Sequence, residues 1–182
     1  SLMYNKTITH LDFSHNIIGG AKEILHKTAP HIVRDNRGKK AVMPMGGESV
    51  AMALQVNKTL VHLNLSWNQL GYQSAILLGE MLTTNKALRH LDLGYNSLTD
   101  SGVSAIFVAL EENAETGALE YLDVTSNGVG PASCCVLSTI LRHNSLIKTI
   151  ILKENPVSEQ GARAIVRSMK YKVKGRRVVM QV

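Results

Sequence analysis

Five asparagines recur in the same local pattern along the 182-residue chain. The pattern is apolar-x-x-apolar-x-apolar-x-x-Asn-x-apolar, and its third copy reads Leu88, Leu91, Leu93, Asn96 and Leu98. Five copies in one register are implausible as a coincidence, so each copy is predicted to be one unit of a repetitive fold. The asparagines that close the copies are Asn16, Asn68, Asn96, Asn127 and Asn155.

Each position of the pattern has a physical role. The apolar residues at the fourth and sixth positions alternate with polar ones, as in a short strand with one buried face. The asparagine follows that strand, where its amide can both donate and accept hydrogen bonds for backbone groups that leave the sheet unpaired. Stacked copies therefore predict a parallel sheet with an asparagine ladder along one edge.

Apolar residues at helical spacing lie between the copies and predict amphipathic helices on the back of the sheet. Each helical segment ends in the phrase Leu-x-x-Asn, and asparagine tolerates the left-handed conformation that commonly closes a helix. The expected buried faces contain Ala75, Leu78 and Leu82 in one segment and Ala105, Val108 and Leu110 in the next, and the closing asparagines are Asn57, Asn85, Asn113 and Asn144.

From Asn68 onward, the ladder asparagines are 28, 31 and 28 residues apart. A period near 28 residues with a full helix resembles the ribonuclease-inhibitor-like subfamily of leucine-rich repeat proteins, and the resemblance covers nearly the whole chain. It implies an α/β fold, a curved horseshoe solenoid with parallel strands on the concave face and helices on the convex face. We expect five repeats plus a partial repeat at each end.

Residues 1–182 are predicted to form a single leucine-rich repeat domain. Both ends read as if cut inside a repeat, because residues 2–7 match 54–59 and a sixth strand is expected over 177–182, with Val178 and Met180 facing inward. We therefore interpret the chain as a fragment of a longer protein. The alternative interpretation is that the terminal turns serve as minimal caps of the solenoid.

The first repeat is longer than the others. Asn16 and Asn68 are 52 residues apart, which predicts an insertion over residues 20–45, including a short helix over 21–27. The insertion also carries a basic run. Long insertions in compact arrays are either functional or flexible, and both interpretations stay open here. The basic run consists of Arg34, Arg37, Lys39 and Lys40.

Composition favours a cytoplasmic protein. The sequence has no apolar run long enough for a membrane span, and its two cysteines, Cys134 and Cys135, are adjacent and provide no disulfide framework. Members of the resembled subfamily include cytoskeleton- and cilium-associated scaffolds, which suggests a similar setting.

The net charge of +6 is unevenly distributed. Residues 45–141 contain three Lys and Arg against nine Asp and Glu, whereas residues 142–182 contain ten against two. The basic end, including Arg176 and Arg177, could attract nucleic acid or an anionic membrane, and the alternative is an ordinary solvated face.

The resemblance implies that polar positions between the signature leucines face the concave side. Like positions of neighbouring strands lie about 4.8 Å apart and form rows across this surface. Trp67, the only tryptophan, is the first candidate for a binding hot spot. The alternative is that the His and Asp residues are structural filler. The candidate protein-binding residues are His10, Asp12, His15, His62, Asn64, Trp67, Arg89, His90, Asp92, Tyr95, Tyr121 and Asp123.

These observations predict a non-catalytic protein-interaction module, a scaffold or regulator that binds a folded protein through its concave face. We expect no catalytic residue, no cofactor and no metal site, because a row of histidines does not converge on one point as zinc ligands do. Two alternatives remain. One is a GTPase activator that resembles the Ran-activating family, with Arg89 as its arginine, and the other is binding of nucleic acid or anionic surfaces through the basic end.

Overall fold

The computed structural model describes residues 2–20, 32–34, 40–42, 46–170 and 176–179. Within these residues, six short strands form one parallel sheet in which spatial order follows chain order. Each repeat therefore pairs only with its neighbours, as in a solenoid. The strands are β1 (His10–Asp12), β4 (His62–Asn64), β5 (His90–Asp92), β6 (Tyr121–Asp123), β7 (Thr149–Ile151) and β8 (Arg177–Val179).

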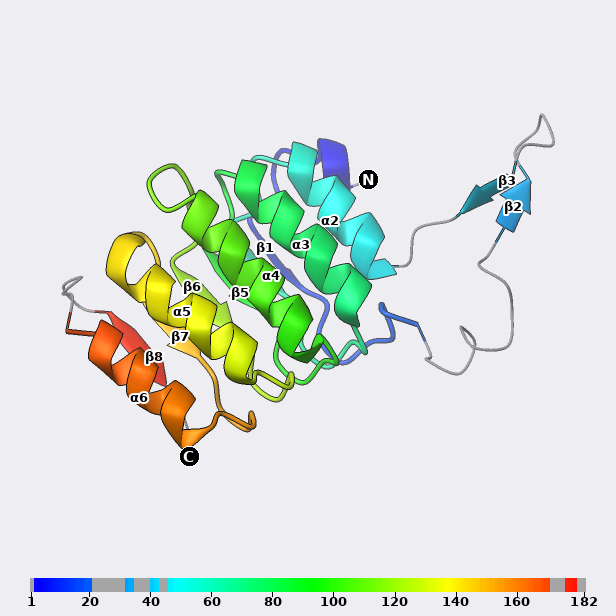
Figure 1. Cartoon of the computed structure of the whole chain (residues 1–182). Coiled ribbons are helices and arrows are strands. Elements are labelled where there is room, and N and C mark those ends of the chain that lie inside the picture. The colour runs from blue at the N-terminus through cyan, green and yellow to red at the C-terminus, as the bar shows by residue number, and fades with distance from the viewer. Residues whose placement is uncertain (1, 21–31, 35–39, 43–45, 171–175, 180–182) are drawn as a thin grey trace.

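The helices form a single layer over one face of the sheet (Figure 1). The predicted α/β solenoid is thereby confirmed, and we refer to the face of the sheet opposite the helices as the concave face. A short antiparallel pair, β2 (Ile32–Arg34) and β3 (Lys40–Val42), forms a separate small sheet. The helices are η1 (Leu2–Tyr4), α2 (Gly46–Val56), α3 (Tyr72–Thr84), α4 (Thr99–Glu112), α5 (Pro131–His143) and α6 (Glu159–Ser168).

The strand register agrees with the repeat pattern. Leu63 pairs with Leu91, and Leu91 pairs with Leu122, so equivalent positions lie side by side. The sixth strand is also present, since Val178 pairs with Ile150. It spans residues 177–179, and the remainder of the predicted 177–182 strand lies outside the described residues.

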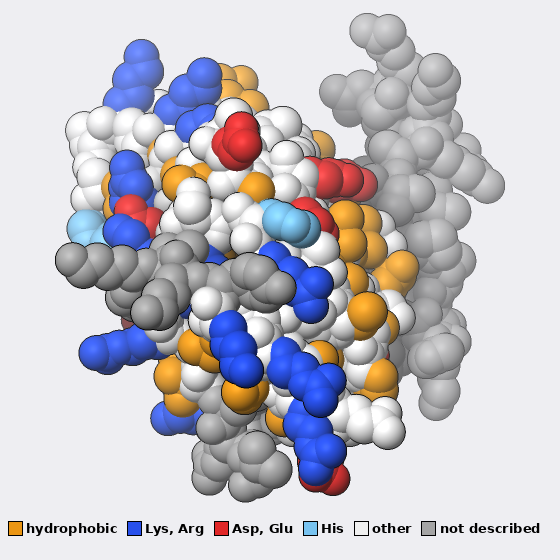
Figure 2. Space-filling view, turned by 60° about the vertical axis from the view of Figure 1, so that its left-hand side comes forward, with side chains coloured by type: hydrophobic (Ala, Val, Ile, Leu, Met, Phe, Trp, Pro, Cys, Tyr) orange, Lys and Arg blue, Asp and Glu red, His pale blue; other side chains and the backbone are white. Residues whose placement is uncertain are grey.

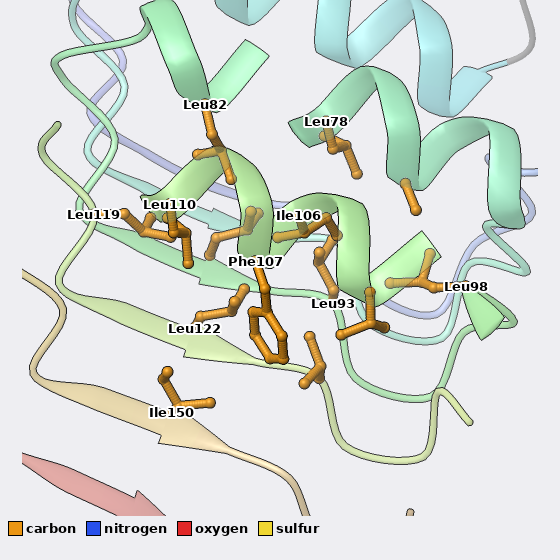
Figure 3. Packing of buried hydrophobic residues seen from close by; sticks show 14 of the residues in the cluster. Leu78, Leu82, Leu93, Leu98, Ile106, Phe107, Leu110, Leu119, Leu122 and Ile150 are labelled. Carbon is orange, nitrogen blue, oxygen red and sulfur yellow. The ribbon is translucent and has the colours of Figure 1, made fainter. Parts of the chain in front are cut away.

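Signature apolar residues and the inner helix faces form one continuous core. Phe107 of α4 points toward the strands and lies beside Leu122 of β6 (Figure 3). The predicted inner face of α3 is confirmed, but that of α4 is wrong at Val108, which is 41% exposed. The helix begins at Thr99, and its buried stripe follows the i, i+3, i+4, i+7 spacing. This stripe consists of Val103, Ile106, Phe107 and Leu110.

The asparagines at the strand ends connect the backbones of successive repeats. The Asn96 amide nitrogen donates to the carbonyl oxygens of Leu65 at 3.0 Å and Leu93 at 2.8 Å. Its Oδ1 accepts from the backbone N–H groups of Asn68 at 3.0 Å and Leu70 at 2.9 Å. One side chain thus satisfies groups from its own repeat and from the preceding one, which the three-residue strands leave unpaired.

A second asparagine ladder lies at the helix ends, where the sequence predicted a left-handed residue. That prediction is wrong, because Asn85 has φ −75° and ψ 125°. Its side chain is buried instead, and the amide nitrogen donates to the carbonyl oxygens of Leu54 at 2.7 Å and Asn57 at 3.1 Å. The last carbonyls of one helix are thereby satisfied by the next repeat. Asn113 and Asn144 make the equivalent bond to the helix before theirs.

Arg176 extends this second ladder beyond Asn144. Its Nε donates to the carbonyl oxygen of Ile147 at 3.1 Å, and its Nη1 donates to that of Leu141 at 2.6 Å. Its Nη2 donates to the carbonyl oxygen of Asn144. The guanidinium group thus serves the carbonyls that an asparagine serves in the preceding repeats, and burial lowers the pKa of Arg176. Arg176, which the sequence grouped with the basic end, is thus half-buried and bonded to backbone carbonyls.

The residues that flank the predicted 20–45 insertion lie close together. A Cβ atom on Gly46 would lie 2.3 Å from the carbonyl oxygen of Ile18, and one on Gly19 would lie 2.1 Å from that of Gln69. No side chain fits at either glycine, so the close approach of the backbones depends on both. The predicted helix over 21–27, together with Arg37 and Lys39, lies outside the described residues.

Replacing Asn96 with alanine is expected to destabilise the fold. Buried backbone groups that lose their partner cost about 1–3 kcal/mol each, so the total loss should reach at least about 2 kcal/mol in urea unfolding. Asn16→Ala is the matched control, because the Asn16 side chain is exposed and bonds only to its own repeat. Equal losses for the two variants would contradict the inter-repeat role.

Arg176→Ala is expected to reduce the unfolding free energy by about 1–3 kcal/mol, since it leaves backbone carbonyls without donors. Arg177→Ala should change it by less than about 0.5 kcal/mol, because the Arg177 side chain is exposed. Thermal and urea unfolding of both variants check this difference. A stable Arg176→Ala protein would exclude the capping role.

Candidate protein-binding surface

The structure arranges the predicted binding residues, except Arg89, in three rows on the concave face, and all of them are exposed or half-buried. The strand register sets the first two rows, while residues that follow the strands form the third. The imidazole row is His10, His62 and His90, continued by Tyr121; the carboxylate row is Asp12, Asn64, Asp92 and Asp123; the aromatic row is His15, Trp67 and Tyr95.

Rings of the imidazole row stack face to face. The ring centroids of His10 and His62 are 4.1 Å apart, those of His62 and His90 are 4.0 Å apart, and Tyr121 follows at 5.5 Å. Stacked rings direct their nitrogen atoms sideways, so the lone pairs do not converge on a metal. Among the described residues, no group of three or more His, Cys, Asp and Glu side chains could hold a metal ion.

Stacking also affects proton binding at the central ring. The pKa of His62 lies below its ordinary value because of burial, and because protonated His90 and His10 would repel its charge. The middle of the row therefore favours the neutral imidazole, and this effect is a consequence of the 28-residue repeat placing equivalent histidines next to one another.

The carboxylate row has a structural role in the turn after each strand. Oδ1 of Asp92 accepts from the backbone N–H of Gly94 at 2.8 Å, and Asp123 accepts from that of Thr125 at 2.8 Å. Burial raises the pKa of Asp92, and the nearby Asp123 and Asp12 carboxylates raise it further. These aspartates therefore do have the structural role that was the alternative to binding. Their hydrogen bonds to the turn do not, however, explain why they carry charge.

The aromatic row is built on unusual backbone. His15, Trp67 and Tyr95 have φ of 56°, 57° and 53°, in the left-handed region that bulky residues seldom occupy. Each directly precedes a ladder asparagine. The N–H of Trp67 donates to the carbonyl oxygen of Gly94 at 2.9 Å, which fixes the turn against the next repeat. The sequence predicted the row but not this conformation, for which the only signal is the position before asparagine.

Side chains of the aromatic row are stacked and accessible. The ring centroids of Trp67 and Tyr95 lie 4.1 Å apart with an interplanar angle of 11°, and His15 stacks on Trp67 at 5.4 Å. Trp67 is 47% exposed. The Tyr95 hydroxyl donates to Glu154 at 2.9 Å, a hydrogen bond that raises the pKa of Tyr95. Glu154 was not among the binding residues predicted from the sequence.

A hollow of about 400 Å³ lies between the imidazole and carboxylate rows. Its walls include His62, His90, Asp92 and Tyr121. Burial raises the pKa of Tyr121 to about 12, and the nearby Asp123 and Asp92 carboxylates act in the same direction. The hollow thus combines aromatic and imidazole rings with carboxylates and has no Lys or Arg among its lining residues.

Arg89 is not part of these rows. It precedes β5, at the edge of the sheet where the strands begin, whereas Trp67 follows the end of its strand. Its guanidinium forms an ion pair with Glu120 at 2.8 Å, and the second oxygen of Glu120 binds Lys148 at 2.6 Å. The Lys148 hydrogen bond and the Arg89 contact lower the pKa of Glu120. Arg89, the arginine of the GTPase-activator alternative, is therefore engaged in an ion pair at the edge of the sheet.

Basic side chains gather at the C-terminal end of the solenoid. Figure 2 brings this end forward and shows Lys and Arg spread over it, with few acidic side chains between them. The uneven charge in the sequence thus corresponds to a spatial separation from the acidic concave rows. The exposed basic residues at this end include Lys153, Arg163, Arg167, Lys170 and Arg177.

Comparison with known proteins agrees with this architecture. The family model described as "Leucine Rich repeat" matches residues 4–21, 56–79 and 84–107. The chain is a leucine-rich repeat protein. Its repeats are of the ribonuclease-inhibitor-like type, as their length and helices indicated. This fold is usually non-catalytic, and the comparisons show no catalytic family.

Two similar proteins place the repeats in context. The mouse (Mus musculus) NACHT, LRR and PYD domains-containing protein 14 is 24% identical over 180 residues, which cover 93% of this chain. The chain spans only 15% of that protein's length. The solved structure of Leiomodin-1 Actin-Binding Site 2 is similar in fold, with a TM-score of 0.64 at 16% identity, covering 93% of this chain and 84% of the other.

Among the described residues of this leucine-rich repeat protein, no helix is both long enough and apolar enough to span a membrane.

The pKa of His62 should rise when a neighbour in the imidazole row is replaced by a neutral residue. When the pKa of a histidine is lower in the folded protein, the unfolded chain takes up the proton first as the pH falls. The folded state therefore loses stability as the pH falls through the unfolded pKa of about 6.5. We expect His62 to titrate below that value in an NMR pH titration, and His90→Gln to move its midpoint upward. His143→Gln, on the helical side, is the control and should leave the His62 midpoint unchanged.

Proposed function

We propose that this leucine-rich repeat protein is a non-catalytic interaction module that binds a folded protein partner through its concave face. The observation that carries the proposal is the stacked aromatic row, centred on Trp67, which is 47% exposed on a surface with no covering element among the described residues. Tryptophan and tyrosine are the side chains most enriched among binding hot spots, and they bury large areas with few rotatable bonds.

The rings occupy a strained turn that recurs along the solenoid. A left-handed conformation costs an L-residue other than glycine or asparagine roughly 1–2 kcal/mol. Ser126 and Glu154 adopt it at the equivalent positions, so the conformation belongs to the turn of the repeat. An exposed tryptophan contributes little to the core, so a binding function explains why Trp67 occupies this position.

Rigidity of the surface supports the same function. Adjacent repeats fix the turn of the aromatic row through backbone hydrogen bonds, including that from Tyr95 N–H to the carbonyl oxygen of Thr125 at 2.7 Å. A surface that is ordered before binding loses less conformational entropy in the complex.

A cytoplasmic location is also part of the proposal. It is supported by Cys134 and Cys135, which are both free thiols.

The Trp67→Ala/Tyr95→Ala variant tests the proposal. In affinity capture from cells of the source organism, quantified by mass spectrometry, it should recover at least about tenfold less of the specific partners than the unmodified chain. Each truncation removes an exposed ring from the centre of the surface, while the buried core stays intact. Thermal unfolding is measured in parallel to show that the variant is folded.

Val108→Ala/Val166→Ala is the matched control. These residues are 41% and 53% exposed on α4 and α6, so the control also removes exposed apolar surface, but from the convex side. Its capture yield should equal that of the unmodified chain. Equal partner yields from a folded Trp67→Ala/Tyr95→Ala variant would exclude the concave face as the binding surface.

A further inference from the structure

The carboxylate row carries negative charge that the fold does not neutralise. Asp12, Asp92 and Asp123 form no ion pair within the described part of the chain. One oxygen of Asp92 accepts from Gly94, and its Oδ2 has no hydrogen-bond partner among those residues. Arg89 and Lys148, the basic residues that precede β5 and β7, are both bound to Glu120. The row is therefore an unpaired line of carboxylates.

Asn64 shows that the turn does not require this charge. It occupies the same row position in β4, between Asp12 and Asp92. Its Oδ1 accepts from the backbone N–H of Ser66 at 3.0 Å, as the aspartates do in their own turns. An uncharged amide therefore satisfies the structural role. The carboxylate charges at the other positions are surplus to the fold, and they bring like charges together on adjacent strands at a cost in stability.

Stacked rings flank the carboxylates on both sides. The hollow of about 400 Å³ is bordered by the imidazole row, and its lining includes Asp12, Asp92 and the Tyr121 ring. The aromatic row lies beyond the carboxylates, at the ends of the strands, where the Glu154 carboxylate contacts the Tyr95 hydroxyl. A cation in this region would meet the carboxylate oxygens between the two rows of rings, and carboxylates bind organic cations through charge-assisted hydrogen bonds.

We propose that the concave surface recognises arginine side chains on an extended, basic segment of its protein partner. The inference rests on the proposed function and specifies the chemistry of the partner. Guanidinium fits better than ammonium, because it is planar, is weakly hydrated and binds carboxylates through two parallel hydrogen bonds. Asp92 and Asp123 supply the carboxylates.

The spacing of the rows suits more than one arginine. The Asp12 and Asp92 positions are separated by the uncharged Asn64, and Asp123 is adjacent to Asp92. Neighbouring strands lie about 4.8 Å apart, so Asp12 and Asp123 are separated by about 14 Å, which is close to the separation of about 13–14 Å between side chains four residues apart on an extended segment. Two arginines at this spacing thus engage Asp12 at one end and the Asp92–Asp123 pair at the other.

A peptide titration with the full chain tests this inference. The probe is acetyl-Gly-Arg-Gly-Arg-Gly-Arg-Gly-amide, and its partner probe carries citrulline in place of arginine, which keeps the shape and removes the charge. Trp67 is the only tryptophan, so its fluorescence reports binding at the surface directly. We expect a saturable change with the arginine peptide, and an affinity at least about tenfold lower with the citrulline peptide.

Asp92→Asn/Asp123→Asn should weaken binding of the arginine peptide at least about tenfold, with little effect on folding, because Asn64 already shows that an amide serves this turn. Glu80→Gln/Glu112→Gln is the control, since it removes two exposed carboxylates from the helices and leaves the affinity unchanged. If thermal unfolding shows that the double Asn variant is damaged, Asp12→Asn, at an exposed position, provides the same comparison.

Equal binding of the arginine and citrulline peptides, no measurable binding of either, or unchanged affinity in the folded Asn variants would overturn the inference. The partner-capture experiment separates this result from failure of the proposed function. If capture depends on Trp67 and Tyr95 but is insensitive to Asp92→Asn/Asp123→Asn, the concave face binds a partner of different chemistry. If capture is insensitive to both pairs, the proposed function itself fails.

Discussion

Hydrogen bonds from asparagine side chains to the backbone of the neighbouring repeat hold this solenoid together. Its strands are three residues long, so the sheet satisfies few backbone groups, and the turns leave others buried. Asn96 supplies partners at the strand end, and Asn85 supplies them at the helix end. Because an amide both donates and accepts, the same residue type serves at both places.

The two ladders also determine what the concave surface presents. Tying the turn to the next repeat places the residue before each strand-end asparagine in the left-handed region, where Trp67 and Tyr95 project and stack. The parallel register places equivalent residues of successive strands side by side, which produces the stacked imidazoles and the line of carboxylates. The rows of side chains on the concave face thus follow directly from the hydrogen bonds and strand pairing that satisfy the backbone, and they are formed before any partner binds.

Much of the fold could be predicted, because a repeat translates sequence spacing directly into position. The register, the core leucines, the sixth strand and the membership of the three rows depend only on where each residue lies in its repeat. The prediction for α4 failed at Val108, because the helical period that buries Ile106, Phe107 and Leu110 places Val108 on the outer face. Asn85 was assigned to the helix end correctly but for the wrong reason, since its conformation is not left-handed.

The sequence by itself determined the repeat unit, the order of the strands and the residues that face each side, because these follow from local periodicity. Only the tertiary structure decided which polar side chains are already engaged in hydrogen bonds or ion pairs within the protein. Arg176 is committed to backbone carbonyls, Arg89 to Glu120, and Asp92 keeps an oxygen without a partner. Those outcomes depend on contacts between residues about one repeat apart in the chain, whose distances are set by the packing of one repeat on the next.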